Sequence, residues 1–257
     1  MRLITPSAAA TSHASKQRLK LSLATTPSEV CEVQRLRYKV FIENMGLSSL
    51  ENIDGLDRDE FDAYCNHLIV RDAQSLKVVG TYRVMSPHAA RTMGQYYSEQ
   101  EFDLSRLNNL RPRIAEAGRA CIHPDYRSGS VIMMLWAGLA AFMKKERCEY
   151  LIGCASISLA DGGHNAAALF NALTENNLAP AEYGVTPHLP FPIDARDSGQ
   201  VPVAPPLLKG YLRSGAWVCG APAWDPDFHS ADLFMLLPLA KLDSRYARHY
   251  LGKPQAG

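Results

Sequence analysis

The sequence predicts an α/β fold of the α+β kind, with a mixed central sheet flanked by helices. Segments in which apolar and polar side chains alternate are separated by segments with apolar residues at helical spacing, as in strands and helices packed in layers. No internal repeat or linker divides the 257 residues, of which 47% are hydrophobic and 21% charged. We therefore expect a flexible tail over residues 1–18 and a single domain over residues 19–257.

The clearest elements of the N-terminal half are a strand and the helix after it. Residues 19–24 alternate apolar and polar side chains, which predicts a half-buried strand. Thr26 followed by Pro27 is typical of a helix start, and apolar residues then recur at helical spacing from Val30 to Phe41. The expected elements after this helix are an acidic connection over residues 44–64, a hairpin of strands over residues 67–70 and 78–85, and a helical or irregular insert over residues 86–112.

The C-terminal half alternates strands and helices before a long loop. Its expected elements are a strand over residues 114–122, a helix from about Ser130, a strand over 150–155, a helix over 163–176, a short helix over 207–214 ended by Gly215, and a strand over 233–237. Seven prolines between residues 180 and 206 indicate a loop on the substrate side. The apolar run over residues 131–143 is shorter than the roughly twenty residues that span a bilayer, so it predicts a buried helix.

The composition argues against several classes of protein. A net charge of +1 provides no overall field for nucleic acid, so we expect no nucleic-acid partner. The six cysteines contain no C-x-x-C pair and the eight histidines no H-x-x-x-H pair, which predicts reduced thiols and no metal site. Residues 1–16 lack the continuous apolar stretch of a secretory signal. These features predict a cytoplasmic protein that does not cross the membrane.

The predicted strand over residues 114–122 carries the strongest candidates for chemistry. Period-two alternation places Glu116 on one face together with Gly118, Ala120 and Ile122, and places Arg119 on the other. Charged side chains in an apolar strand need partners, because burying an unpaired charge is costly. Glu116 and Arg119 therefore either form a structural ion pair or take part in a reaction.

The turn after this strand contains Arg127, Ser128, Gly129 and Ser130 and leads directly into the apolar helix. The free backbone N–H groups at a helix start, together with an arginine, suit a phosphate group. The alternative is a simple strand-to-helix turn in which Ser128 or Ser130 caps the helix.

Four short motifs resemble those of the acyl-homoserine-lactone synthases, in the same order. They are R-x-x-x-F at residues 37–41, D-x-x-D at residues 59–62, G-x-x-R at residues 80–83 and E-x-x-R at residues 116–119. The resemblance implies a GNAT-like acyltransferase fold and transfer of an acyl chain from acyl carrier protein to an amine.

From about residue 20 the chain resembles more closely the bacterial L-ornithine Nα-acyltransferases. The features that carry the resemblance are residues 35–38 with Phe41, residues 66–70, 80–83 and 117–119, His123 with Pro124, and residues 205–211 and 225–228. The resemblance implies that a (3R)-3-hydroxyacyl chain passes from acyl carrier protein to the α-amine of L-ornithine, giving lyso-ornithine lipid. It implies no bound cofactor, since the phosphopantetheine arm of the carrier protein is the donor, and it leaves open a peripheral contact with the inner face of the cytoplasmic membrane.

With this resemblance, the expected catalytic residues are Glu116, which accepts the proton of the amine directly or through water, and Arg119. The backbone of residues 120–122 would donate to the thioester carbonyl. Arginine forks suit the carboxylate of an amino acid, so Arg37 and Arg83 are expected substrate contacts, with Arg119 as a third candidate.

The expected acidic contacts of the substrate are Asp59, Asp62 and Asp161, with Asp225 and Asp227 as further candidates for the side-chain ammonium of ornithine. The alternative for Asp59 and Asp62 is structural pairing with the arginines. The alternative for Asp161 is a turn and a helix cap.

On the donor side, residues 127–130 would hold the phosphopantetheine phosphate. This turn is shorter than the R-x-x-G-x-G/A pattern of acetyl-CoA-binding proteins, which favours a carrier-protein donor. A docking face for the acidic carrier protein would consist of Arg106, Arg111, Arg113, Lys144, Lys145 and Arg147, although a solvated surface is the alternative. The side chains that would line an acyl tunnel, or else pack in the core, are Met133, Met134, Leu135, Trp136 and Phe142.

Three competing functions remain at this stage. The first is an acyl-homoserine-lactone synthase or another N-acyl amino acid synthase, because the shared motifs do not name the acceptor. The second is a non-catalytic acyl-carrier or lipid-binding protein. The third is a phospholipid-type O-acyltransferase, since His67 and Asp72 fit H-x-x-x-x-D, but these residues bracket a predicted strand and would lie on its opposite faces.

Overall fold

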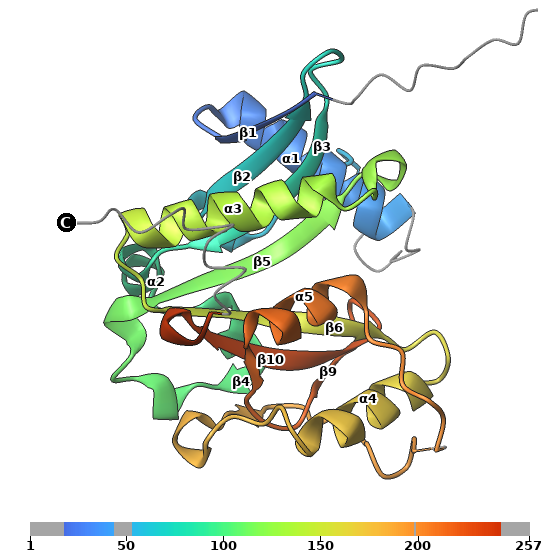
Figure 1. The fold of residues 1–257 in the computed structure, drawn as a ribbon. Helices are drawn as coiled ribbons and strands as arrows, with labels where there is room; N and C mark the ends of the chain where they lie inside the picture. The colour runs from blue at the N-terminus through green and yellow to red at the C-terminus, as the bar shows by residue number, and fades with distance from the viewer. Residues whose placement is uncertain (1–17, 44–52, 198, 243–257) are drawn as a thin grey trace, which may run out of the picture.

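The computed structural model describes residues 18–43, 53–197 and 199–242, so residues 1–17 of the expected tail lie outside the described residues. An eight-stranded sheet runs through the molecule in the order β1-β2-β3-β5-β6-β10-β8, and β9 pairs with β10 (Figure 1). Its strands are β1 (Leu19–Leu23), β2 (Asn66–Asp72), β3 (Val78–Met85), β5 (Ile114–Ile122), β6 (Tyr150–Ser158), β8 (Trp217–Val218), β9 (Ala223–Asp225) and β10 (Ser230–Pro238). The sheet is mixed because β5 and β6 are parallel, whereas the other neighbours are antiparallel.

Helices cover both faces of the sheet. The α-helices are α1 (Pro27–Tyr38), α2 (Pro87–Met93), α3 (Ser130–Lys145), α4 (His164–Thr174) and α5 (Pro206–Ser214). Figure 1 shows α3 and α5 in front of the sheet and α1 behind it. The buried side chains agree, because Leu135 and Leu139 of α3 share one apolar cluster with Leu208 of α5, while Val33 and Leu36 of α1 belong to another. The predicted α/β fold with a mixed, helix-flanked sheet is confirmed.

Most of the predicted elements are present. Thr26 caps α1 and its side chain accepts from the backbone N–H of Glu29, β5 has the predicted bounds, and Gly215 ends α5 at a positive φ of 92°. The strands β8 and β9 were not predicted, because strands of two or three residues are too short to show an alternation of apolar and polar side chains. The insert between β3 and β5 consists of α2, several single 3-10 turns and β4 (Phe102–Asp103), which pairs with β7 (Thr186–Pro187).

The apolar run over residues 131–143 forms most of α3, as predicted, and packs against β1, β2, β3 and β5. Within the described ranges, none of the helices combines the length and apolar character needed to cross a membrane.

The sheet divides between β5 and β6. These strands pair only at their first residues, 114–116 with 150–152, and diverge beyond that point (Figure 1). Gly153 lies where they begin to separate, and a Cβ atom there would lie 2.3 Å from the carbonyl oxygen of Ala117. Only glycine permits this close approach of the two backbones. The division leaves one edge of β5 without a strand partner from Ala117 onward in the described part of the chain.

A bulge in β5 overturns the predicted alternation of its side chains. The register between β3 and β5 shifts between Thr81 and Arg83, and Arg119 has a positive φ of 54°. Because one extra residue reverses every later side chain, Ala120 packs on the α3 side of the sheet, where Ala117 also lies. The expectation that Glu116 shares a face with Ala120 and Ile122 is therefore wrong. The sequence could not predict this bulge, because the pattern of apolar residues does not show a local change of backbone conformation.

We expect Gly153→Ala to lower the free energy of unfolding by about 1–3 kcal/mol, because the new methyl group meets backbone that cannot move aside. Urea unfolding followed by circular dichroism measures this loss. Gly118→Ala is the matched control, since a Cβ at Gly118 meets nothing within 4 Å. Equal stability of the two variants would contradict the close-approach explanation.

Candidate active site

A cavity of about 850 Å³ occupies the opening between β5 and β6. Residues 116–122 of β5 form one wall, and Cys154, Ser156 and Ser158 of β6 contribute to the other. Arg127 and Gly129 lie on its lining at the start of α3, and Pro205 and Leu207 at the start of α5. The strand-turn-helix segment that the sequence singled out therefore forms one side of a single cavity.

Glu116 lies buried on the cavity wall. Its carboxylate accepts hydrogen bonds from the backbone N–H of Tyr97 at 2.6 Å, from the backbone N–H of Ser98 at 2.8 Å and from the Ser98 hydroxyl at 2.5 Å. Burial raises its pKa, although these donors and the nearby Arg83 oppose the increase. A carboxylate has about four acceptor positions, so one remains for a substrate proton or a water. Burial and a raised pKa suit a proton acceptor.

The partners of Glu116 differ from the expected ones. The structural alternative was an ion pair with Arg119, but the donors come instead from the single 3-10 turn Tyr97–Gln100 in the insert. Sequence reasoning missed Tyr97 and Ser98, because a serine in an irregular insert carries no periodic signal.

Three arginines and three aspartates form a closed ring of ion pairs beside β5, which we call the charge ring. Arg37 pairs with Asp57 and Asp62, Arg83 pairs with Asp62 and Asp59, and Arg119 pairs with Asp59 and Asp57. The Arg37–Asp62 contact is bidentate, with distances of 2.8 and 3.0 Å. The arginines come from α1, β3 and β5, and the aspartates come from the segment before β2. The ring thus ties four parts of the chain together.

The charge ring keeps its members ionised although they are buried. Burial opposes the charge on Asp62, but the guanidinium groups of Arg37 and Arg83 outweigh it and hold its pKa well below the ordinary value. Burial likewise disfavours the charge on Arg83, yet Asp59 and its other neighbours keep the pKa raised. Three positive and three negative charges cancel, so the ring adds no net charge to the cavity.

The structure separates the predicted substrate contacts into two groups. Arg37 has no exposed surface, and its guanidinium is engaged by Asp57 and Asp62, which is the structural alternative. Arg83 and Arg119 belong to the ring but also line the cavity. Arg83 Nη2 and Arg119 Nε are buried and lack a hydrogen-bond partner among the described residues. These donors remain available to an anionic group in the cavity.

Asp59 and Asp62 hold arginines, in agreement with their structural alternative. Asp161 accepts from the backbone N–H groups of Gly163 and Asn165 at the start of α4, which is the turn-and-cap alternative. Asp57 was missed by the sequence reasoning, although its position two residues before Asp59 was a signal. Asp225 lines the cavity and accepts from the backbone N–H groups of residues 227 and 228.

The turn before α3 leaves the N-terminus of that helix open toward the cavity. Gly129 caps α3 with a positive φ of 95°, and no side chain caps the helix. The Ser128 and Ser130 hydroxyls lie 3.2 Å apart, and Arg127 Nε donates to the carbonyl oxygen of Ile122. Among the described residues, no side chain caps the backbone N–H groups of the first turn, which suits a phosphate. Phosphopantetheine binding by these residues stays a prediction.

On the donor side, the structure agrees with the core-packing alternative for three of the five side chains considered for an acyl tunnel, and the docking face stays a prediction. α3 has 16 residues, so Lys144 and Lys145 lie about 24 Å from the cavity end of this helix. Arg111 and Arg113 are paired with Glu99 and Glu149. Among the five side chains expected in an acyl tunnel, Leu135, Trp136 and Phe142 pack in the core, and Ile132 is the α3 side chain that lines the cavity.

The two C-terminal blocks that carried the family resemblance support the site. Residues 225–228 present Phe228 to the guanidinium of Arg119, 4.6 Å from the ring centroid, and to Phe41 in an edge contact at 6.0 Å. Tyr211 of α5 is buried, and its hydroxyl lies 2.8 Å from that of Tyr82 on β3. Both blocks therefore pack against the β3–β5 half of the sheet.

The H-x-x-x-x-D arrangement does not form an acid–base pair. The His67 ring contacts the carbonyl oxygen of Asp62, whereas Asp72 accepts from the backbone N–H groups of Gln74 and Ser75 in the hairpin turn.

A mixed sheet that opens between two parallel strands, with helices on both faces and a cavity at the opening, is the arrangement of the GNAT-like acyltransferase fold. Residues 36–137 match the family described as the acetyltransferase (GNAT) domain. The fold is similar to that of BjaI, a CoA-dependent acyl-homoserine lactone synthase solved with MTA, with a TM-score of 0.53 and 16% identity. The likeness covers 93% of this chain and 92% of that one. The chain is an acyltransferase of this class.

Full-length sequence similarity narrows the class to one family. The chain is 34% identical over 250 residues to the L-ornithine N(alpha)-acyltransferase of Brucella abortus, covering 90% of this chain and 88% of that protein. It is 33% identical over 254 residues to the L-ornithine N(alpha)-acyltransferase of Agrobacterium fabrum, covering 92% and 86%. The chain belongs to the L-ornithine N(alpha)-acyltransferase family, as its motifs indicated.

We expect Asp62→Asn to lower the free energy of unfolding at pH 7 by about 3–5 kcal/mol, because Arg37 and Arg83 lose their shared counter-charge in a buried site. Chemical denaturation measures the loss. Asp54→Asn is the matched control, since Asp54 forms an exposed ion pair with Arg58 and its loss costs below about 1 kcal/mol.

The pH dependence provides a second measurement of the same prediction. A carboxyl group whose folded pKa lies below its unfolded value of about 3.9 stabilises the fold fully above that pH and loses its contribution as pH falls. The stability difference between wild type and Asp62→Asn should therefore shrink below about pH 4. A difference that is constant from pH 7 to pH 3 would contradict ionised Asp62 as its source.

Proposed function

We propose that this acyltransferase moves a (3R)-3-hydroxyacyl chain from acyl carrier protein to the α-amine of L-ornithine. The observation that carries the proposal is the position of Glu116, buried on the cavity that the open N-terminus of α3 also reaches. The relatives named as L-ornithine N(alpha)-acyltransferases support the choice of acceptor. The reaction forms an amide bond between the acyl carbon and the α-nitrogen and breaks the thioester bond of the donor.

Glu116 accepts the proton that the α-amine loses, directly or through one water. The neutral amine then attacks the thioester carbon. The tetrahedral intermediate expels the phosphopantetheine thiolate, and the proton lost by the attacking nitrogen converts this thiolate to the thiol. Beyond Ala117 the edge of β5 has no strand partner among the described residues, so its backbone N–H groups are candidates for the thioester oxygen. The raised pKa of Glu116 brings it closer to that of its proton donor, which improves proton transfer.

Arg83 and Arg119 orient the acceptor through its carboxylate. Their unpartnered nitrogens, Nη2 and Nε, match the requirement for charge-assisted hydrogen bonds to an anion. The charge ring fixes both guanidinium groups, so little side-chain freedom is lost when the substrate binds. In this mechanism Arg119 is a substrate contact, and Glu116 is the catalytic acid–base group.

The donor reaches the thioester position from the start of α3. Arg127 and the backbone of residues 128–130 hold the phosphate of the phosphopantetheine arm at the cavity mouth. A free CoA thioester carries the same phosphopantetheine arm. The distinction between the two donors therefore depends on contacts with the carrier protein outside the cavity.

We expect Glu116→Gln to lower kcat/KM about 100- to 10,000-fold, because the amide cannot accept the proton. Quantifying acyl-ornithine by mass spectrometry in a purified assay measures the loss. In the wild type, kcat/KM should rise with pH as Glu116 loses its proton, at a pH above the ordinary pKa of a glutamate. This rise should be absent from Glu116→Gln. Glu149→Gln, at an exposed ion pair with Arg113, is the matched control. Turnover of Glu116→Gln near that of the control would rule out the general base.

For the donor, we expect Arg127→Gln to raise KM for hydroxyacyl carrier protein about tenfold, because the loss of one charge-assisted hydrogen bond weakens binding by about this factor. The exposed Arg213→Gln on α5 is the control. Carrier-protein docking predicts that KM also rises with salt and that the matching CoA thioester is a poorer donor. An equal or higher kcat/KM with the CoA thioester would overturn the proposed donor.

Acceptor choice is tested with L-ornithine, L-lysine and S-adenosylmethionine as parallel substrates. A preference for S-adenosylmethionine would assign the chain to lactone synthesis instead. Absence of transfer to any amine would leave the non-catalytic binding function.

A further inference from the structure

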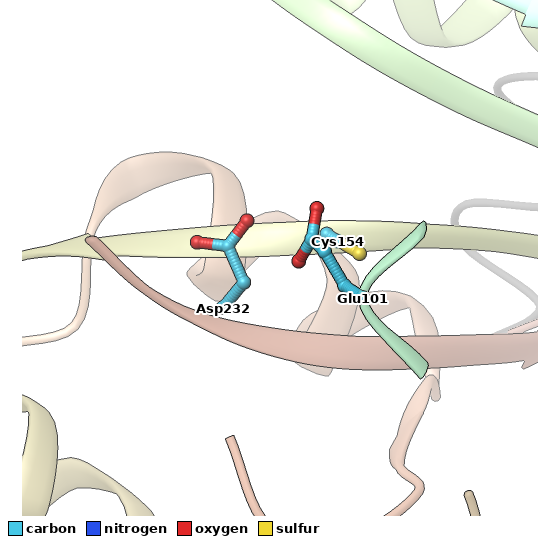
Figure 2. Close-up of side chains that lie close together, drawn as sticks. All are labelled: Glu101, Cys154 and Asp232. Atoms are coloured by element: carbon cyan, nitrogen blue, oxygen red, sulfur yellow. The ribbon is translucent and has the colours of Figure 1, made fainter. Parts of the chain in front are cut away.

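A second group of acidic side chains lies away from the charge ring, with Asp232 on the wall of the same cavity and Glu101 on a smaller pocket that shares Asp225 with it. Figure 2 shows Glu101, Cys154 and Asp232 close together, from the segment before β4, from β6 and from β10. Their ligand atoms all lie within 4.8 Å of one another. Cys154 and Asp232 line the cavity, and so does Asp225. We call Glu101 and Asp232 the carboxyl pair.

The carboxyl pair has no cationic partner. Asp232 is 4% exposed, accepts hydrogen bonds from the hydroxyls of Ser156 and Ser230, and shares a hydrogen bond with Glu101. Glu101 Oε2 is buried and has no hydrogen-bond partner in the described part of the chain. None of the ion pairs among the described residues includes either carboxylate. This contrasts with the charge ring, where every aspartate is paired.

Burial raises the pKa of both carboxyl groups. The charges of Asp232 and Asp225 raise the pKa of Glu101 further, and Asp225 also raises that of Asp232, whereas hydrogen bonds from Ser230, Ser156 and Glu101 oppose the increase at Asp232. The pair therefore retains a proton near neutral pH. A cation placed between the carboxylates would replace this proton and restore both ionised forms.

The charge ring presents donor nitrogens at another part of the cavity wall. Arg83 is 3% exposed, lines the cavity and has a buried Nη2 without a partner. Glu116 also lies on the cavity wall, connected to Ser98 at 2.5 Å, whose hydroxyl lies 3.5 Å from the thiol of Cys154. Along its wall the cavity thus presents a site for an anion at Arg83, a proton acceptor at Glu116 and a site for a cation at the carboxyl pair.

We propose that Glu101 and Asp232 bind the side-chain ammonium of a diamino acid whose carboxylate contacts Arg83 and Arg119. The inference rests on the proposed acylation of an amino acid and deepens it, since it names the residues that select an acceptor with a cationic side chain. The α-amine and the terminal amine of ornithine are about 6 Å apart in the extended chain. This length allows the α-amine to lie near Glu116 while the terminal ammonium reaches the carboxyl pair.

A metal ion is the other cation that the group could hold. Burial raises the pKa of the Cys154 thiol well above its ordinary value, which disfavours the thiolate that metal binding requires. An ammonium needs only acceptors, and the two carboxylates provide them. The geometry therefore points to an organic ammonium.

The test compares L-ornithine with L-norvaline, which has the same carbon chain without the terminal amine. kcat/KM is measured for both acceptors in wild type, Asp232→Asn, Glu101→Gln and the control Asp103→Asn, an exposed residue near Glu101 whose side chain accepts from Ser105. The variants at the carboxyl pair should lower kcat/KM for ornithine about 10- to 100-fold and leave that for norvaline nearly unchanged. Within one variant, the ratio of kcat/KM for ornithine to kcat/KM for norvaline does not depend on the fraction of protein that is folded. The melting temperature of each variant checks folding separately.

An equal loss with both acceptors would overturn the proposal, because it would indicate a structural role for the pair. A wild type that acylates norvaline as well as ornithine would also overturn it, while the proposed acylation of α-amines would stand. Loss of the ornithine preference on treatment with a chelator, with recovery on addition of Zn²⁺ or Mn²⁺, would assign the group to a metal. A wild type inactive with both acceptors would instead refute the proposed function itself.

Discussion

The charge ring is the constraint on which the arrangement of the site depends. Three guanidinium groups meet where α1, β3 and β5 come together, and those of Arg37 and Arg83 are buried and would be costly without a counter-charge. The aspartates that balance them occupy one short segment before β2, so this segment can take only one position. Three charges of each sign make the ring neutral, and Arg83 Nη2 and Arg119 Nε remain without a hydrogen-bond partner in the part of the chain that the structure describes.

The ring depends in turn on the irregular backbone of β5. The bulge at Arg119 turns this side chain toward Asp57, Asp59 and Phe228, while the strand before the bulge keeps Glu116 against the insert. If β5 had no bulge, the side chains after residue 118 would lie on the opposite face of the sheet. The divergence of β6 from β5 then opens the cavity beside these groups. One bulge and one divergence thus bring Arg83, Arg119, Glu116 and Asp232 to a common cavity.

The cavity has a consistent polarity along its wall. Buried donor nitrogens lie at the charge ring, Glu116 lies on β5, and Asp232 on β10 lies beside Glu101 with no ion pair to either carboxyl group among the described residues. An α-amino acid with a cationic side chain has the complementary order of carboxylate, amine and ammonium. Specificity in such a site comes largely from the cost of leaving a buried charge unmatched.

The sequence by itself determined the mixed sheet, the bounds of β5, the starts of α1 and α3, and the family of the chain, because periodicity, capping residues and ordered motifs are local signals. It also identified Glu116, Arg83 and Arg119 as the residues of interest, but it left their partners open. Only the tertiary structure assigned Ser98 to Glu116, closed the charge ring and joined Glu101 to Asp232. These contacts join residues far apart in the chain, and the bulge that makes several of them possible is a change of backbone dihedrals that no pattern of side chains records.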